Sequence, residues 1–190
     1  YRAAEAERRA VRRACDAAEA AGACIHIAHT STPEGIDIAA DAGMTTEVTP
    51  HHLLLSRADL GELDTYGRMN PPLRREKRRE DVYDRVADGS VDMIATDHAP
   101  HTTEEKDASI WDAPSGVPGV ETALPLLLAE AADPDTARGY ERVRDLTATN
   151  PAQVFDIPRK GAIEPGSDAD LVLVDTTETT EIRADDLHTD

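Results

Sequence analysis

Histidines gather in one part of this 190-residue sequence, and an aspartate stands among them. Six of the seven histidines lie between Cys24 and Thr102. Four of them, together with Asp97, stand where short apolar segments end. Imidazole nitrogens and carboxylate oxygens are common ligands of catalytic zinc. The clustering therefore indicates a metal-dependent site, and ordinary hydrogen-bonded structural histidines are the alternative.

His29 and Asp97 are the two strongest candidates for metal ligands. His29 ends one apolar segment, where a neutral imidazole could reach a metal at the mouth of a sheet, while His26 falls on the opposite face. Asp97 ends another buried segment, and an unpaired carboxylate there would be costly unless a metal or a cation lies near. Asp97 could also exchange a proton with metal-bound water, whose pKa zinc lowers to about 7.

The pair His51 and His52 follows a third segment and could serve as ligand, substrate contact or turn packing. We favour packing for this pair.

Trp111 and Tyr66 stand in polar loops, and we expect local packing for them rather than ligand recognition.

Two further loops have the chemistry of a ligand site, with ordinary barrel loops as the alternative. Asn70 opens the first, and its amide offers a donor and an acceptor that suit a cyclic ureide. The second loop, residues 113–119, contains prolines that stiffen it and glycines that let a ligand approach the backbone.

Strand and helix patterns alternate along the chain and place these residues. Three short β-branched or Ile-rich segments predict strands at 24–29, 45–49 and 91–96. Apolar periodicity, with glycines after several segments, predicts helices at 3–21, 34–42, 74–88, 120–132 and 140–147. Asn150 and Pro151 predict the start of another short helix. Alternation at 169–174 predicts a later strand and a second, β-rich layer.

Repeated strand–helix units imply parallel strands with helical crossovers, so the predicted fold class is α/β. Three units do not close a barrel, and an open doubly wound sheet is the alternative. In either fold the polar residues lie just past the strand ends, where ligands bind.

Composition excludes several classes of partner. Asp and Glu total 38 against 20 basic residues, and the net charge of −18 excludes nucleic acid as a partner. No apolar run approaches the roughly 20 residues of a membrane helix.

Two cysteines form neither a metal pattern nor a disulfide framework, which indicates a reducing cytoplasm. We interpret the acidic surface as an adaptation to a high-salt cytoplasm, where charge repulsion is screened.

Three strings together resemble the dihydroorotases of the amidohydrolase superfamily. They are Thr-Pro-His-His-Leu at 49–53, Asn-Pro-Pro-Leu-Arg at 70–74 and Thr-Asp-His-Ala-Pro-His at 96–101. The resemblance runs in order over nearly the whole chain. Allantoinases and hydantoinases share the barrel but tend to have other residues in these strings, so dihydroorotases are favoured.

This resemblance implies a distorted, TIM-like (β/α)₈ barrel with two zinc ions at the strand ends. Residues 1–157 would form its carboxyl-terminal part, roughly strands six to eight, and 158–190 would begin the return to a β-rich flanking domain. The implied reaction is the reversible ring closure of N-carbamoyl-L-aspartate to L-dihydroorotate in pyrimidine biosynthesis. His29 matches the sixth-strand zinc ligand, and Asp97 matches the eighth-strand ligand and general acid and base. The residues that match the family's substrate contacts are Asn70, His101, Ser115 and Gly116.

The chain departs from the family pattern in lacking several ligands. The first-strand His-x-His pair, the bridging carboxylated Lys or Asp and the fifth-strand His are expected upstream of Tyr1. Two ligands fall short of the usual three, so we expect the chain alone to bind zinc poorly and be inactive. An open barrel edge predicts missing partner strands or self-association into a homo-oligomer. An allantoinase, a dihydropyrimidinase or a non-catalytic scaffold remain alternatives, although His29 and Asp97 argue against the scaffold.

Overall fold

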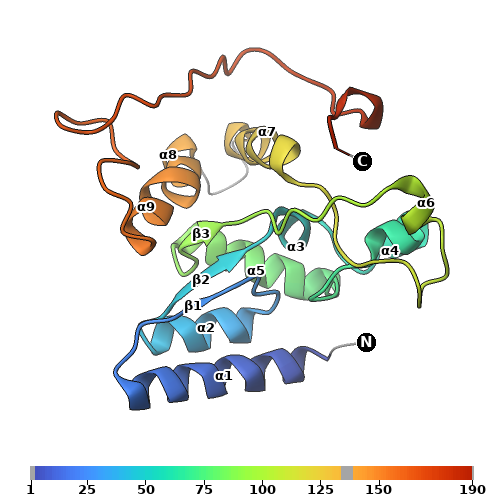
Figure 1. Ribbon diagram of the computed structural model, residues 1–190, viewed down its shortest axis with the longest axis horizontal. Helices are drawn as coiled ribbons and strands as arrows, with labels where there is room; N and C mark the ends of the chain where they lie inside the picture. The colour runs from blue at the N-terminus through green and yellow to red at the C-terminus, as the bar shows by residue number, and fades with distance from the viewer. Residues whose placement is uncertain (1–2, 134–138, 190) are drawn as a thin grey trace.

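Three parallel strands form the centre of the computed structural model, which describes residues 3–133 and 139–189 (Figure 1). The strands are β1 (His26–Ile27), β2 (Thr45–Val48) and β3 (Met93–Ile94), in the order β1-β2-β3. His26 pairs with Thr45, and Glu47 pairs with Met93. The predicted α/β class with parallel strands is therefore confirmed, although each strand is shorter than the sequence indicates.

Helices lie on both sides of the strands, with α1 and α2 at one end of the structure and α7, α8 and α9 at the other (Figure 1). No helix of the described residues is long and apolar enough to cross a membrane. The helices are α1 (Ala4–Ala21), α2 (Pro33–Asp41), α3 (Pro50–Leu54), α4 (Leu60–Leu63), α5 (Glu76–Asp88), α6 (Thr103–Lys106), α7 (Val120–Ala132), α8 (Tyr140–Arg144) and α9 (Asn150–Val154). Short 3₁₀ helices are η1 (Asp64–Gly67) and η3 (Ala184–Asp186), and η2 (Asp145–Thr149) is a π-helix.

Helix ends follow the local chemistry of the sequence. Gly22 and Gly89 end α1 and α5 in the left-handed conformation, with φ of 63° and 96°. Thr32 and Thr49 begin α2 and α3, and each side chain accepts a hydrogen bond from a backbone N–H of the first turn. Thr49 stands directly after β2, and Thr32 ends the short turn that follows β1, so the caps also fix both turns.

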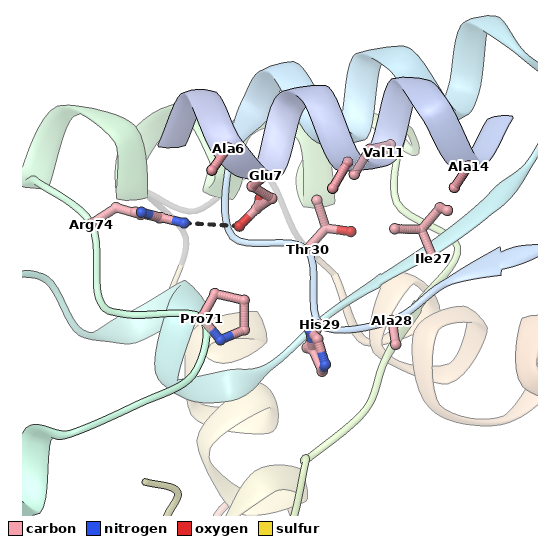
Figure 2. A pocket seen from close by; sticks show the side chains of 11 residues that line it. Ala6, Glu7, Val11, Ala14, Ile27, Ala28, His29, Thr30, Pro71 and Arg74 are labelled. Carbon is pink, nitrogen blue, oxygen red and sulfur yellow. Dashed lines mark hydrogen bonds and ion pairs between the residues drawn. The ribbon is translucent and has the colours of Figure 1, made fainter. Parts of the chain in front are cut away.

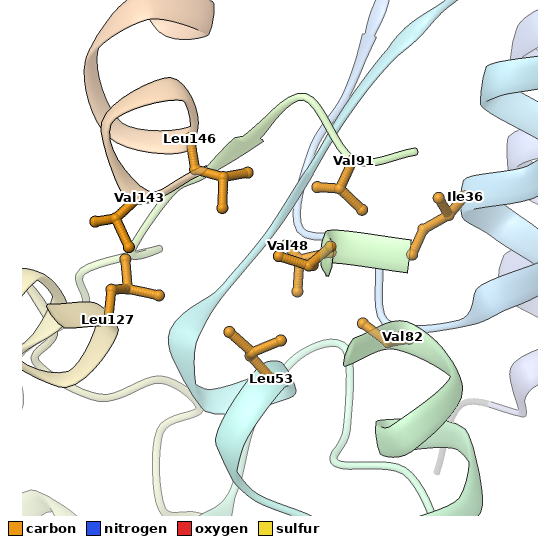
Figure 3. Packing of buried hydrophobic residues seen from close by; sticks show 9 residues of the cluster. Ile36, Val48, Leu53, Val82, Val91, Leu127, Val143 and Leu146 are labelled. Atoms are coloured by element: carbon orange, nitrogen blue, oxygen red, sulfur yellow. The ribbon is translucent and has the colours of Figure 1, made fainter. Parts of the chain in front are cut away.

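The main apolar core lies between the strands and the helices that follow them (Figure 3). Val48 of β2 is fully buried between Ile36 of α2 and Leu53 of α3. The remaining buried members of this cluster are Val82, Val86, Val91, Leu127, Val143 and Leu146. A second cluster, built on Val11 and Cys15 of α1, packs α1 against α2. Burial of these side chains holds each helix against the strand that precedes or follows it.

Two predictions about the later part of the chain are wrong. The short helix α9 begins at Asn150 as predicted, but Asn150 does not cap it, because α8, η2 and α9 are continuous and its side chain donates instead to the Asp92 carbonyl. The π-helical turn accommodates Pro151, which has no backbone N–H to donate. Residues 169–174 form no strand: they are exposed, Leu173 completely, and no described strand pairs with them. The boundary at 157 and 158 stays a prediction.

Candidate functional site

The carboxyl ends of the three strands bring the candidate metal ligands to one edge of the sheet. His29 follows β1, His51 lies in α3 just after β2, and Asp97 follows β3. Since β2 is the middle strand of a parallel sheet, His51 stands between His29 and Asp97 along the edge of the sheet. The charges of His29 and Asp97 both act on the pKa of His51, one lowering it and the other raising it. The three side chains therefore share one electrostatic neighbourhood at the rim of the sheet.

His29 and Asp97 also share an unusual backbone conformation. Their φ angles are 38° and 48°, in the left-handed region that residues other than glycine seldom adopt. Such positions cost on the order of 1–3 kcal/mol and cluster at functional sites. The two residues that the sequence singles out as ligands share this conformation with Asp64, Asp156 and Arg159.

The backbone of His29 is held by a carboxylate that sequence analysis overlooked. Glu47 Oε1 accepts from the His29 N–H at 3.2 Å, and Glu47 Oε2 lies 3.0 Å from His26 Nε2. His26 Nδ1 lies 2.8 Å from Thr45 Oγ1. Glu47 of β2 therefore contacts both His26 in β1 and the backbone of His29 just after it, and His26 has a structural role. Only the register of β1 against β2 reveals this contact.

His52 is a buried packing residue, as predicted. Its Nε2 lies 2.8 Å from the Pro71 carbonyl, which can only accept, so Nε2 carries the proton and Nδ1 accepts from Thr49 Oγ1. Burial lowers the pKa of His52 to about 4, opposed by the bond to Pro71. Burial likewise lowers the pKa of His51 to about 3, so both rings are neutral at pH 7.

The buried state of His52 predicts a pH dependence of stability. The pKa of His52 lies below the ordinary 6.5 in the folded chain. Between pH 6.5 and about 4, the unfolded chain therefore binds a proton at His52 that the folded chain does not. Stability should be fully present above pH 6.5 and should fall by up to about 1.4 kcal/mol per unit as the pH drops towards 4. Urea midpoints between pH 7 and 5.5 would measure this slope. In a His52→Gln variant the slope should be shallower, and an equal slope would contradict the assignment.

Asn70 and Ser115, two predicted substrate contacts, line the same cavity of about 620 Å³. Ile110 and Trp111 line it as well, and Trp111 is 83% exposed, so the expectation that Trp111 packs locally is wrong. The loop around it packs through Ala113 instead, which is almost fully buried. The other lining residues are Leu60, Asp64, Gly67, Arg68, Met69, Pro72 and Leu73.

His101 contacts the 113–119 loop, and Gly116 is part of that loop. His101 Nε2 lies 3.3 Å from the Ser115 carbonyl, which ties the imidazole to the loop. Gly116 has a φ of 116°, and an added Cβ would stand 2.6 Å from the Cβ of Ala99, so glycine is required there. The structure thus brings the four predicted substrate residues to two neighbouring segments, although the contacts with substrate stay predictions.

A second cavity, of about 350 Å³, opens beside His29 between α1 and β1 (Figure 2). Glu7 of α1 reaches across it to Arg74, with Oε2 and a guanidinium nitrogen 2.9 Å apart. Glu7 also accepts from the backbone and hydroxyl of Ser31 and from the hydroxyl of Thr32, and Arg74 Nε donates to Ser31 Oγ. This buried network joins α1, the loop that follows His29 and the segment that begins at Asn70.

The two candidate ligands at the edge of the sheet are of types that bind zinc, but they are too few for a catalytic zinc site. His29 and Asp97 offer an imidazole nitrogen and a carboxylate oxygen, both ordinary zinc ligands. Within residues 3–133 and 139–189, however, no three His, Cys, Asp or Glu side chains gather closely enough to hold a metal ion. Catalytic zinc usually keeps three protein ligands. The described residues alone therefore do not form a complete catalytic zinc site.

Comparison with known proteins gives consistent results. The model of the family described as "Amidohydrolase family" matches residues 5–188. A dihydroorotase of Halobacterium salinarum is 64% identical over 188 residues, covering 99% of this chain and 44% of the relative. A dihydroorotase of Methanosarcina acetivorans is 47% identical over 146 residues, covering 76% of this chain and 31% of the relative. The chain spans less than half the length of these relatives.

Among solved structures, an L-hydantoinase (dihydropyrimidinase) from Arthrobacter aurescens superposes with a TM-score of 0.81 at 27% identity. A D-hydantoinase (dihydropyrimidinase) from Thermus sp. superposes with a TM-score of 0.78 at 28% identity. Each match covers 85% of this chain and 38% of the solved chain. The arrangement of strands and helices described above is therefore that of a known hydrolase fold.

Proposed function

Because this chain belongs to the amidohydrolase family, we propose that it supplies part of a zinc-dependent dihydroorotase. The complete enzyme would interconvert N-carbamoyl-L-aspartate and L-dihydroorotate in pyrimidine biosynthesis. One observation carries the proposal: His29 and Asp97 stand in strained conformations on either side of β2, at the edge of the sheet where barrel enzymes place their chemistry. The 64% identity to a dihydroorotase over 188 residues favours this substrate among cyclic amides.

His29 and Asp97 would hold zinc, with the remaining ligands supplied by the rest of the longer protein. When bound, two zinc ions would polarise the ring carbonyl and lower the pKa of a water molecule to about 7. Asp97 would hold the proton that is delivered to or taken from the ring nitrogen. Its exposure at the rim leaves the carboxylate open to substrate and solvent.

Asn70, His101, Ser115 and Gly116 would hold the substrate. The amide of Asn70 can both donate to and accept from the ureide edge of dihydroorotate. Ser115 offers a hydroxyl in the same cavity, and Gly116 leaves room for close approach of the ligand to the backbone. His101 is already oriented by its contact with the Ser115 carbonyl.

Hydantoinase or dihydropyrimidinase activity is the second candidate, favoured by the solved structures that superpose on this chain. A substrate panel on the full-length zinc protein distinguishes the two. We expect turnover of dihydroorotate to exceed that of hydantoin, dihydrouracil and allantoin by orders of magnitude. Preference for one of the other rings would refute the dihydroorotase proposal, and a zinc-loaded protein inactive on all four would favour a scaffold.

The acidic composition predicts a dependence on salt. The net charge of −18 creates self-repulsion that salt screens, since the Debye length falls from about 10 Å at 0.1 M to about 3 Å at 1 M. The thermal unfolding midpoint should rise between 0.1 M and 2 M potassium chloride. An unchanged midpoint would refute adaptation to a high-salt cytoplasm, for which the Halobacterium relative is further support.

A further inference from the structure

Lys106 is a buried cation that the proposed reaction does not use. Only 2% of the residue is exposed, and its ammonium donates to the carbonyls of Pro114 at 3.0 Å and Gly116 at 2.6 Å. No carboxylate within residues 3–133 and 139–189 forms an ion pair with it, whereas the surface cations Lys77 and Lys160 both have acidic partners. Burial, reinforced by the charge of Arg68, lowers the pKa of Lys106. A buried ammonium without an anion is costly, so its retention requires a reason.

The two carbonyls that Lys106 binds lie on either side of Ser115. The carbonyl of Ser115 itself lies 3.3 Å from His101 Nε2. Three consecutive carbonyls of the loop are therefore occupied, two of them by one ammonium group. This arrangement fixes the peptide planes on both sides of Ser115, and with them the direction in which its hydroxyl and the Gly116 backbone face.

Lys106 also joins this loop to the segment that carries Asn70. Thr65 Oγ1 donates to the Lys106 carbonyl at 2.7 Å. In return, the Gly116 N–H donates to the Arg68 carbonyl at 2.9 Å. Thr65 and Arg68 belong to the stretch that leads directly to Asn70, so one lysine bonds with both walls of the 620 Å³ cavity.

A capping box sets the position of Lys106. The Thr102 hydroxyl accepts from the Glu105 N–H, and the Glu105 carboxylate accepts from the Thr102 N–H. This box closes the single turn of α6 directly after His101. The lysine at the end of the turn is thereby directed towards the loop, and His101 at its start is oriented by the same unit.

We propose that Lys106 is a positioning residue, whose ammonium group holds the Ser115–Gly116 turn in the conformation that binds substrate. The inference rests on the proposed function, because it assumes that this turn contacts dihydroorotate. Lys106 does not touch the reacting atoms and acts through the two carbonyls.

Steady-state kinetics of the full-length zinc enzyme test the proposal. Lys106→Met should raise KM for dihydroorotate about 10- to 100-fold, as expected for losing charged hydrogen bonds, and should change kcat much less. Lys106→Gln keeps N–H donors but is too short to span both carbonyls, so its KM should be intermediate. Lys77→Met removes an exposed lysine and is the matched control, with unchanged KM and kcat. An unchanged KM in Lys106→Met would overturn the proposal.

Chemical rescue separates the ammonium group from general packing. In Lys106→Ala, added propylammonium should restore a low KM, while potassium chloride at the same ionic strength should not. Rescue by both salts, or by neither, would contradict a specific role for the ammonium.

Hydrogen exchange gives a readout that does not depend on the substrate. Backbone amides of 113–119 should exchange faster in Lys106→Met than in the wild type, while those of α5 should stay unchanged. If the wild-type enzyme does not turn over dihydroorotate, the proposed function fails, yet this measurement still tests Lys106. Unchanged exchange across 113–119 would show that the lysine does not hold the loop.

Discussion

Asp97→Asn in the full-length zinc enzyme should lower kcat for dihydroorotate by about 10²- to 10⁴-fold, the usual contribution of a general acid or base. Asparagine has nearly the same shape and can still offer an oxygen to a metal, but it cannot take up and release a proton near pH 7. Substrate binding by the variant should remain within a few-fold of the wild type, because Asn70, His101 and the 113–119 loop are unchanged. Equilibrium binding of dihydroorotate, measured beside single-turnover rates, separates the two effects.

The control for this experiment is a carboxylate that lines the 620 Å³ cavity. Asp64 lines the 620 Å³ cavity and also has a positive φ, of 45°, but it stands in η1 and not at a strand end. Asp64→Asn should therefore leave kcat within a few-fold of the wild type. Near-normal turnover in Asp97→Asn, with the zinc content verified, would remove the proton-transfer assignment.

Glu7→Gln should destabilise the fold more than any surface substitution in this chain. The change removes the carboxylate charge of Glu7 from beside the guanidinium of Arg74, which is only 6% exposed, and breaking a buried ion pair costs about 3–5 kcal/mol. The same carboxylate holds the Ser31 and Thr32 turn, so α1 and the loop after His29 should loosen together. Urea unfolding at constant salt would measure the loss of free energy.

A surface glutamate of the same helix gives the matched control. Glu5 pairs with Arg8 and Arg9 on the exposed face of α1, and Glu5→Gln should leave the urea midpoint almost unchanged. The double variant Glu7→Leu with Arg74→Met removes both charges and should be less destabilised than Glu7→Gln alone. If Glu7→Gln and Glu5→Gln behave alike, the buried network contributes little to stability.

Much of the fold could be predicted because local chemistry and packing agree. The α7 helix begins and ends at the predicted residues, and α1 and α5 end at glycines, as the pattern predicts. The errors come from contacts that the local pattern does not contain. Asn150 has the chemistry of a cap but bonds to Asp92, 58 residues away, and the alternating residues at 169–174 find no strand to pair with among the described residues.

The candidate site could be predicted in outline, because strand ends of a parallel sheet meet at one edge. What the sequence did not reveal are the residues that hold the candidates in place. Glu7 lies 67 residues from Arg74, and Glu47 lies 18 residues from His29. Each pair joins two separate elements of the fold, so only the folded chain shows these partners. Lys106 looks like any charged residue of a short helix until its burial is known.

The left-handed backbone at His29 and Asp97 has a consequence for how this lineage can change. Glycine would occupy both positions without strain, so mutation without selection for chemistry would drift towards it. A descendant that had abandoned catalysis would gain stability from such replacements and retain no pressure to reverse them. Under the proposed function, the imidazole and the carboxylate at these two positions are kept at a cost in folding stability.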